Sequence, residues 1–386
     1  MESCNKLFTL ISFGCLLTLC SCEKEPVIPD DCLVKGTSFF SKIIPDEYII
    51  TYNFENNFRS LQSLEYKVEE SLERMNISSS AIEQILPGEN TIVVAALQSD
   101  ELDQLKRDPN VESIEPDRII GIKSCITIVT PRSVSWSVRK TGYGRIGLVS
   151  NKVAWIIDTG LDLDHPDLNI DSEKSRSFIT GQTSADDNNG HGTHVAGIIG
   201  AKNNLTGILG IASDIKLVGL KVLNDLGEGR LSNVISAVRH VTTNGKSGDV
   251  VNMSLGGEGI SLALEREIQQ AADKGILFSI AAGNDKKNVS GYSPARFNHP
   301  NVFTVAAVDS FNRFATFSNF GEAVDVAAYG VNIVSTFTNG RYATMSGTSM
   351  AAPHLSGLLL TRGVNIPTRG FASNSPDAKI YPVARE

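Results

Sequence analysis

Cysteine is scarce in this chain of 386 residues and is confined to its first third. All six cysteines lie at or before residue 125, and the 261 residues that follow contain none. The larger part of the chain therefore has neither a disulfide nor a thiol nucleophile, which excludes a cysteine hydrolase. Cys32 and Cys125 are the candidates for a disulfide in an exported chain.

An excess of positive charge is also missing. The formal net charge is −8, from 35 Lys and Arg against 43 Asp and Glu. Nucleic-acid-binding proteins carry a basic face, so no nucleic-acid partner is expected. The charge is unevenly spread: residues 46–118 hold 16 acidic and 6 basic residues, whereas residues 119–386 hold 22 and 25. This difference predicts two units with different tasks.

The N-terminus lacks an apolar run long enough to stay in a bilayer as a permanent helix. Lys6 precedes an apolar stretch of 13 residues, 8–20, which is typical of a cleaved secretory signal. The sequence Leu19-Cys20-Ser21-Cys22 is similar to a bacterial lipoprotein cleavage box. We expect a signal peptide at 1–22, export to the extracellular space or outer envelope, and a lipid anchor on Cys22. An ordinary signal peptide is the alternative.

Two patterns of apolar residues follow this signal. A linker at 23–44 leads to residues 45–120, where strand and helix signals alternate in the order β-α-β-α-β. A processing linker at 121–135 separates this unit from residues 136–386. There, apolar strands alternate with helices, which favours an α/β fold with a parallel sheet flanked by helices. The strands are expected at 153–157, 216–222, 250–255, 276–281 and 302–308, and the helices at 192–201, 231–242 and 261–274. The helix that follows Ser349 is expected to end near Thr361, and a polar tail is expected after Ser373-Asn-Ser-Pro.

Three segments carry candidate catalytic side chains. Asp158 ends an apolar strand, His191 opens a helix in NGHGTHVAG, and Ser349 opens another in MSGTSMAAPH. Each residue alone has an ordinary structural interpretation, as a turn aspartate, a packed histidine or a helix cap. His191 and His194 are three residues apart, so a metal pair is a competing interpretation. The glutamate of an HExxH motif is absent.

Together the three residues have the chain order of an Asp-His-Ser triad. A hydroxyl becomes a nucleophile when a neighbouring base takes its proton, and a carboxylate holds that imidazole in the required tautomer. Asn284 follows another apolar strand, where its amide could donate to a developing oxyanion. The pattern predicts nucleophilic hydrolysis that requires no cofactor for its chemistry.

The chain resembles the subtilisin-like serine proteases, the subtilases, in the motifs IIDTGLDLDHPDL, NGHGTHVAGIIG, NMSLGG, AAGND and MSGTSMAAPH. The resemblance implies Asp158 as the orienting acid, His191 as the base and Ser349 as the nucleophile. It implies Asn284 as the oxyanion donor. It also implies two walls of a substrate cleft, formed by Ser254, Leu255 and Gly256 and by Ala281, Ala282 and Gly283.

The same resemblance implies regulation and specificity. Residues 45–120 resemble the inhibitory pro-domain of subtilases, which would make the chain a zymogen with its own pro-domain as an intramolecular partner. The sequence GYSPA at 291–295 is similar to the proteinase K branch and implies broad cleavage of proteins or peptides at apolar or aromatic residues. Asp167 matches a position that binds structural Ca²⁺ in many subtilases, with oxygens around Asn204 completing the shell. A catalytically dead, peptide-binding pseudoprotease is the alternative.

Overall fold

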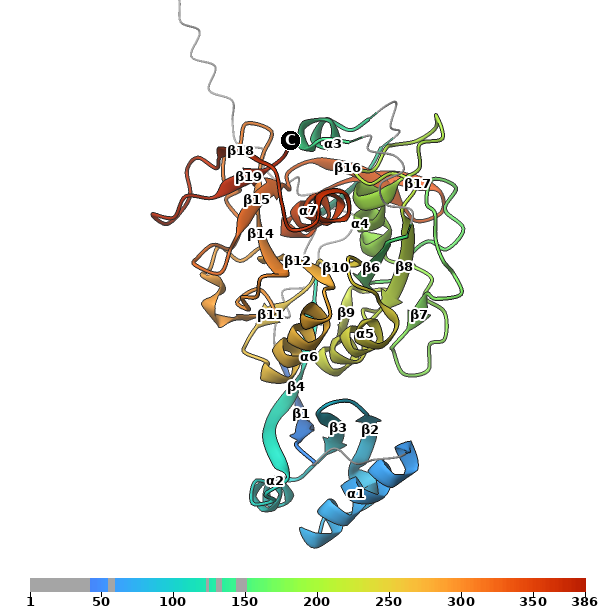
Figure 1. Ribbon diagram of the computed structural model, residues 1–386, viewed down its shortest axis with the longest axis vertical. Helices are drawn as coiled ribbons and strands as arrows, with labels where there is room; N and C mark the ends of the chain where they lie inside the picture. Colours follow the sequence, from blue (N-terminus) through green and yellow to red (C-terminus); the bar gives the residue numbers. More distant parts are fainter. Residues whose placement is uncertain (1–41, 55–59, 123–124, 130–133, 144–150) are drawn as a thin grey trace, which may run out of the picture.

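The computed structural model describes residues 42–54, 60–122, 125–129, 134–143 and 151–386. The predicted signal peptide, with Cys22, and the candidate disulfide partner Cys32 lie outside these residues. Figure 1 shows a small N-terminal domain joined to a larger one by a long strand, β4 (Val111–Gly121). Within the described ranges, no helix combines the length and apolar character needed to cross a bilayer.

The small domain packs two helices against an antiparallel sheet of order β2-β3-β1-β4. Its buried side chains come from the helical three-four spacing of α1 and from the inner face of β1 and β3. The elements are β1 (Lys42–Tyr52), α1 (Leu61–Arg74), η1 (Ser79–Ala81), β2 (Ile82–Leu86), β3 (Thr91–Ala96) and α2 (Ser99–Leu105). The predicted order holds with one addition, β2. This strand lies at the sheet edge and is largely solvent-accessible, so its sequence shows no apolar alternation.

The larger domain is built on a nine-stranded sheet of order β18-β19-β15-β14-β12-β10-β6-β8-β7. Every pair in it is parallel except β18 with β19. The strands are β6 (Val153–Asp158), β7 (Arg176–Ser177), β8 (Lys216–Lys221), β10 (Val250–Met253), β12 (Leu277–Ala281), β14 (Val302–Val308), β15 (Val326–Tyr329), β18 (Thr368–Phe371) and β19 (Pro382–Ala384). The predicted α/β architecture with a parallel sheet is confirmed.

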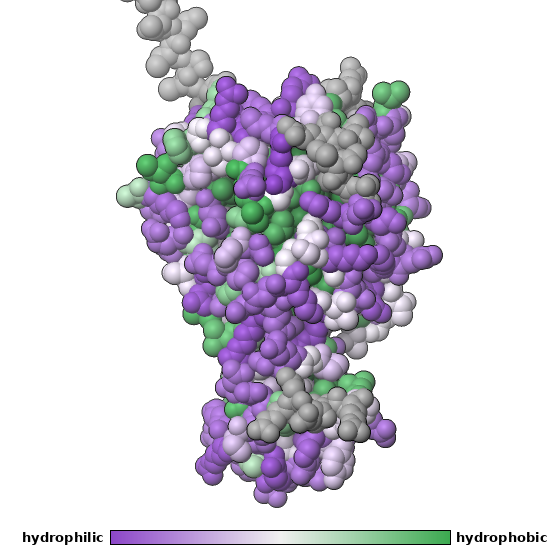
Figure 2. All heavy atoms as spheres, viewed as in Figure 1, coloured by the Kyte–Doolittle hydropathy of each residue, from purple (hydrophilic) through white to green (hydrophobic). Residues whose placement is uncertain are grey.

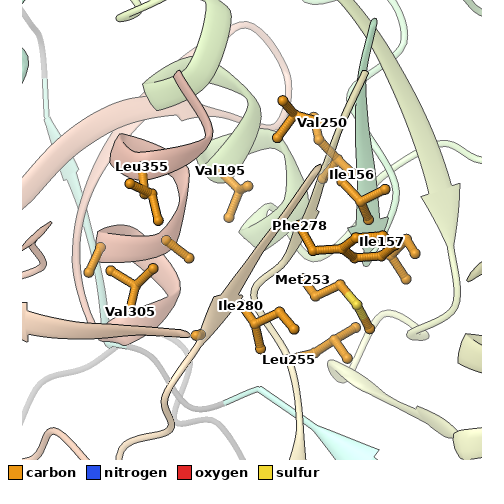
Figure 3. Packing of buried hydrophobic residues seen from close by; sticks show 14 of the residues in the cluster. Ile156, Ile157, Val195, Val250, Met253, Leu255, Phe278, Ile280, Val305 and Leu355 are labelled. Carbon is orange, nitrogen blue, oxygen red and sulfur yellow. The ribbon is translucent and has the colours of Figure 1, made fainter. Parts of the chain in front are cut away.

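Helices cover both faces of this sheet. Figure 1 shows α4 (His191–Gly200) and α7 (Thr348–Arg362) on one side of the strands, and α5 (Leu231–Asn244) and α6 (Leu262–Asp273) on the other. Ile156, Met253 and Phe278 from neighbouring strands are buried together, and Val195 and Leu355 extend the core into α4 and α7 (Figure 3). This burial is the main stabilising term for the domain. It also holds the strand ends and helix starts that carry the candidate catalytic residues.

Short strands complete the larger domain. A three-stranded sheet joins β16 (Ile333–Phe337), β17 (Arg341–Ser346) and β5 (Cys125–Val129), so part of the predicted processing linker is a strand. The remaining elements are α3 (Trp136–Thr141), β9 (Glu228–Arg230), β11 (Gly257–Glu258), η2 (Val289–Gly291) and β13 (Tyr292–Ser293).

The tail after the last helix is mostly solvent-accessible, as its polar sequence predicts, but it also contributes structure that was not predicted. β18 and β19 add two strands to the sheet, and Tyr381 is fully buried. Its hydroxyl accepts a hydrogen bond from the N–H of Gly321 at 2.9 Å and donates to Asp377 at 2.7 Å. The strands are only four and three residues long, too short for a periodic pattern. The residues of β18 are exposed, and the burial of β19 comes from its pairing with β15.

Candidate active site

Asp158 and His191 form a buried hydrogen-bonded pair. Asp158 is the last residue of β6 and His191 is the first residue of α4. His191 Nδ1 lies 2.7 Å from Asp158 Oδ1, and both side chains are fully buried. With the Nδ1 proton directed at Asp158, Nε2 keeps a lone pair that can accept a proton. Nε2 has no hydrogen-bond partner among the described residues.

The turn before α4 is held by a second buried carboxylate, Asp187. It accepts hydrogen bonds from the N–H groups of Asn189, Gly190 and Thr193 and from the Thr193 hydroxyl, at 2.6 to 3.0 Å. Burial raises the pKa of Asp187. Gly190 has a φ of 100°, and a Cβ there would overlap a neighbouring aromatic ring. The NGHG sequence is therefore required to present His191 at the helix start.

Ser349 is the second residue of α7, and its side chain is tied to the edge of the cleft. Its hydroxyl donates to the carbonyl oxygen of Ser254 at 3.1 Å, and the Ser254 hydroxyl donates to the carbonyl oxygen of Ser349 at 2.8 Å. No hydrogen bond joins Ser349 to His191 in the described structure. The first N–H groups of a helix have no acceptor within the helix, so they suit an anionic ligand.

The amide of Asn284 is oriented by Thr348, the residue before Ser349. Asn284 Oδ1 accepts from the N–H of Thr348 at 2.8 Å and from its hydroxyl at 2.9 Å. The Thr348 hydroxyl oxygen in turn accepts from the N–H of Gly283 at 3.0 Å. Because Oδ1 is directed at Thr348, the N–H donors of this amide lie on its other side. Asn284 and Ser349 line the same pocket.

This pocket brings both predicted walls together. Residues 254–257 line one side and residues 281–285 line the other. Tyr292, Ser293 and Ala295, from the GYSPA segment, also line it. The side chains of 281–283 are small, so the space between the walls is left for a substrate side chain. The substrate-binding roles of these residues stay a prediction.

The cleft holds an extended segment of the chain itself. β4 pairs antiparallel with β9, and its last residue, Gly121, also bridges to Gly256 in antiparallel fashion. The N–H of Ile122 donates to the carbonyl oxygen of Gly227 at 3.2 Å. Gly121 and Ile122 line the pocket that contains Ser349. The end of the small domain thus lies between two edges of the larger one, as a peptide substrate would.

His194 takes no part in a metal pair with His191. It is buried, and its Nε2 lies 3.0 and 3.1 Å from the carbonyl oxygens of Ile333 and Ala343. Burial lowers the pKa of His194 to about 3, so it is a neutral donor that connects α4 to β16 and β17. Among the described residues, no group of three His, Cys, Asp or Glu side chains could hold a metal ion.

The residues around Asp167 do not fit the predicted calcium site. Its carboxylate accepts from the side-chain amide of Asn204 at 2.9 Å and from the N–H of Ile208 at 2.9 Å. The Tyr342 hydroxyl lies 3.4 Å away, with its pKa raised to about 12 by burial and by this carboxylate. Asn204 Oδ1 is turned to Thr206 instead. Calcium requires converging oxygen ligands, whereas hydrogen-bond donors converge here.

Sequence reasoning missed Asp187, Thr348 and the strand β9. Asp187 and Thr348 hold other site residues in place, so a search for the three residues of a triad does not identify them. The LGEGR stretch that contains β9 has turn-forming glycines, and only pairing with β4 makes it a strand.

A buried Asp–His pair and a serine at a helix start in the same domain are features expected of an Asp-His-Ser hydrolase. Residues 151–361 match the subtilase family, and the chain belongs to that family. It is therefore a serine endopeptidase, acting on protein substrates.

Several relatives place this assignment in context. The chain is 40% identical to a thermostable alkaline protease of Halalkalibacterium halodurans over 269 residues, which is 69% of this chain and 71% of the relative. It is 33% identical to the subtilisin-like serine protease AsES of Sarocladium strictum, over 82% of this chain and 79% of the relative. The second match extends well upstream of residue 151. The crystal structure of a cold adapted subtilisin-like serine proteinase superposes with a TM-score of 0.57, at 32% identity, covering 66% of this chain and 98% of that one.

Proposed function

We propose that this endopeptidase works through Asp158, His191, Ser349 and Asn284, and that it is made as a zymogen whose small domain blocks the cleft. The buried pair of His191 and Asp158, with Nε2 left as an acceptor, is the observation that carries the catalytic assignment. Helices α4 and α7, which carry the base and the nucleophile in their first turns, lie side by side in Figure 1. No cofactor or metal enters the proposed chemistry.

In the proposed reaction the Ser349 hydroxyl turns from the Ser254 carbonyl and attacks the scissile carbonyl carbon, while His191 Nε2 takes its proton. Asp158 stabilises the resulting imidazolium. The Asn284 amide and the N–H of Ser349 donate to the oxyanion. When the C–N bond breaks, His191 gives the proton to the leaving amine, and an ester remains on Ser349. Water, deprotonated by His191, then hydrolyses this ester and restores the hydroxyl.

We propose broad specificity for apolar or aromatic side chains, because most of the surface that lines the pocket is apolar. Ala281, Ala282 and Gly283 leave room on one side, and Leu255 offers an apolar surface on the other. The antiparallel bridge between Gly121 and Gly256 uses main-chain atoms, which every substrate has. Main-chain pairing of this kind holds an extended peptide irrespective of its sequence.

The zymogen proposal is supported by the acidic surface that the small domain turns to the larger one. Arg230 pairs with Glu47 at 2.7 Å and with Glu83 at 3.0 Å, and Arg266 pairs with Glu112 at 2.6 Å. Figure 2 shows a mainly hydrophilic surface where the two domains meet. These pairs are partly exposed, so each contributes little on its own. They favour one orientation of docking.

A buried arginine adds a less exposed contact. The Arg239 guanidinium donates to the carbonyl oxygens of Leu86 and Asn90 in the β2–β3 turn, and it also pairs with Glu267. Arg239 and Glu267 are on α5 and α6, so the turn is held where these two helices meet. Gly88 packs against the guanidinium, where a Cβ would come within 3.0 Å of it.

We further propose export with a lipid anchor on Cys22, on the small-domain side of the cut. Cleavage within 121–135 would then release the catalytic domain from the membrane. A disulfide between Cys32 and Cys125 would keep the two pieces joined if the cut precedes Cys125. Membrane fractionation of the processed protein with and without reductant tests this point. Equal release under both conditions would exclude the tether.

The main test is expression of the chain from Glu23 as wild type and as Ser349→Ala, followed by intact mass spectrometry. Self-processing by Ser349 predicts two fragments from the wild type, with a cut within 121–135, and one intact chain from the variant. If both chains stay whole, the small domain is first removed with a separate protease, because the end of β4 lies in the cleft, and a fluorophosphonate probe then decides whether Ser349 is reactive. A folded chain that is neither cut nor labelled would reject the proposed catalytic assignment and support the peptide-binding alternative.

A further inference from the structure

Two carboxylates of β4 are bound at helix starts of the larger domain. The Asp117 carboxylate accepts from the N–H of Ser232 at 3.2 Å and from its hydroxyl at 2.5 Å, in the first turn of α5. The Glu115 carboxylate accepts from the N–H of Leu262 at 3.0 Å and from the hydroxyl of Ser261, the N-cap of α6. Both sites thus combine a serine hydroxyl, a main-chain N–H and the positive end of a helix.

The two acids have a simple relation to the cleft. Asp117 is four residues before Gly121 and Glu115 is six residues before it, so both lie on one face of the same extended strand. At roughly 3.3 Å per residue, Glu115 is about 20 Å upstream of the residue that pairs with Gly256. The register of that strand is set by main-chain pairing with β9 and Gly256. The larger domain therefore binds the side chains of Glu115 and Asp117 at positions fixed by the main-chain register.

One donor in these sites is on β4 itself, the N–H of Arg118, which donates to Asp117 at 2.7 Å, and the donors described above belong to the larger domain. Ser232 and Ser261 sit on helices packed against the main sheet, so they remain in place when β4 leaves. Arg266, which pairs with Glu112 three residues before Glu115, adds positive charge beside the same strand. Burial beneath the small domain raises the pKa of Glu115 and of Asp117. When a peptide binds without the rest of the small domain, its carboxylates stay more accessible to water. The free-energy cost of removing them from water is then smaller, whereas the donors of the larger domain are still present.

We infer that the mature endopeptidase keeps a carboxylate-binding exosite at the starts of α5 and α6, and that it prefers protein segments with acidic residues four and six positions before the residue paired with Gly256. This inference rests on the proposed zymogen function, because β4 must first be released. The partner is an extended acidic segment of a substrate protein. Short peptides that begin after these two positions lack the acidic residues and do not reach the exosite.

The test compares three synthetic peptides with the processed enzyme from which the small domain has been removed. The first has the sequence of residues 111–129, the second carries Glu115→Gln and Asp117→Asn, and the third begins at residue 119. Charge-assisted hydrogen bonds predict that kcat/KM for the first peptide exceeds that for the second by about tenfold. The reductant is kept constant, and cleavage positions are read by mass spectrometry. Added salt should bring the ratio of the two kcat/KM values closer to one, because it screens the charges.

A Ser261→Asp enzyme removes the half of the exosite that binds Glu115. Aspartate is as good an N-cap as serine, so α6 keeps its cap, while the new charge repels the substrate carboxylate. The part of the preference that depends on Glu115 should be lost, while the part that depends on Asp117, bound at Ser232, should remain. Ser135→Asp is the control, because Ser135 caps α3 in the same manner and changes the net charge equally. Its ratio should match that of the wild type.

The outcomes separate the two proposals. If the peptide that begins at residue 119 is not cleaved and Ser349 is not labelled by a fluorophosphonate, the proposed catalytic function fails. If that peptide is cleaved but the two long peptides are cleaved equally, the exosite is rejected and the catalytic function stands. A preference that is as large in Ser261→Asp as in the wild type would also reject the exosite, since Ser261 would then make no contribution to binding Glu115.

Discussion

Thr348 is the residue whose replacement tests the oxyanion assignment most sharply. It is fully buried, and its hydroxyl both donates to Asn284 Oδ1 at 2.9 Å and accepts from the N–H of Gly283 at 3.0 Å. Thr348→Val keeps the shape and removes both bonds. The N–H of Thr348 still donates to Asn284 at 2.8 Å, so the amide keeps one of two anchors. We therefore expect a loosened amide rather than a lost one.

The magnitudes follow from these bonds. Removing the donor itself, in Asn284→Ala, should lower kcat by about 10²–10³, a loss known from the corresponding kind of donor in a subtilisin. Thr348→Val should lower kcat by about tenfold, which corresponds to ~1.4 kcal/mol, with little change in KM. It should also reduce the free energy of unfolding by about 1–3 kcal/mol, because the Gly283 N–H is left unsatisfied.

The assay is a double-mutant cycle with an apolar peptide substrate and the mature enzyme. If Thr348 acts by positioning Asn284, Thr348→Val should cost almost nothing in kcat once Asn284 is alanine. The same tenfold loss in both backgrounds would refute the positioning role. Thr361→Val is the control on the same helix, because the Thr361 hydroxyl only donates to helix carbonyl oxygens. An unchanged kcat in Asn284→Ala would reject the oxyanion assignment.

Three further predictions concern docking, the proposed metal site and the tail. The pKa values of Glu115 and Asp117 are raised on docking, chiefly by burial, so docking is coupled to proton uptake. In gel filtration the cleaved complex should therefore dissociate more slowly near pH 5 than near pH 8. Glu115→Gln and Asp117→Asn should make this pH dependence weaker. Asp167→Asn should lower the free energy of unfolding by about 1–3 kcal/mol equally in EDTA and in calcium, and a loss seen only with calcium would restore a metal site. In the inactive serine variant, Tyr381→Ala should lower that free energy by about 3–5 kcal/mol in urea titrations, whereas a change below 1 kcal/mol would contradict the packing of the tail.

Local pattern was sufficient for the main elements of the larger domain. The β14 boundaries agree with the prediction at both ends, and the other four predicted strands and three predicted helices differ by one or two residues. These strands are buried on both faces and bounded by turns, so each appears in the sequence as a continuous apolar run that can be recognised. The helices carry apolar residues at three-four spacing. Both signals arise within a few consecutive residues, which is why a single sequence contains them.

The sequence alone also determined the candidates Asp158, His191 and Ser349, because each lies at the junction of an apolar element and a turn. The orientation of Asn284 was decided elsewhere, by Thr348, which is 64 positions away along the chain. The passage of β4 through the cleft likewise required β9 and Gly256 to be brought together. Hydrogen bonds between distant segments leave no periodic trace, since each partner is an ordinary residue in its own neighbourhood.

The short edge strands and the surroundings of Asp167 also depended on tertiary structure. β2, β18 and β19 are short or exposed, and a strand of three residues has too few side chains to display an alternation. Asp167 matched a familiar motif, yet the donors that surround its carboxylate come from a loop some forty residues away and from β17. Sequence thus determined which residues lie at element ends and the chemistry that they can perform. Tertiary structure decided which way each amide and carboxylate turns, because that depends on partners that only folding supplies.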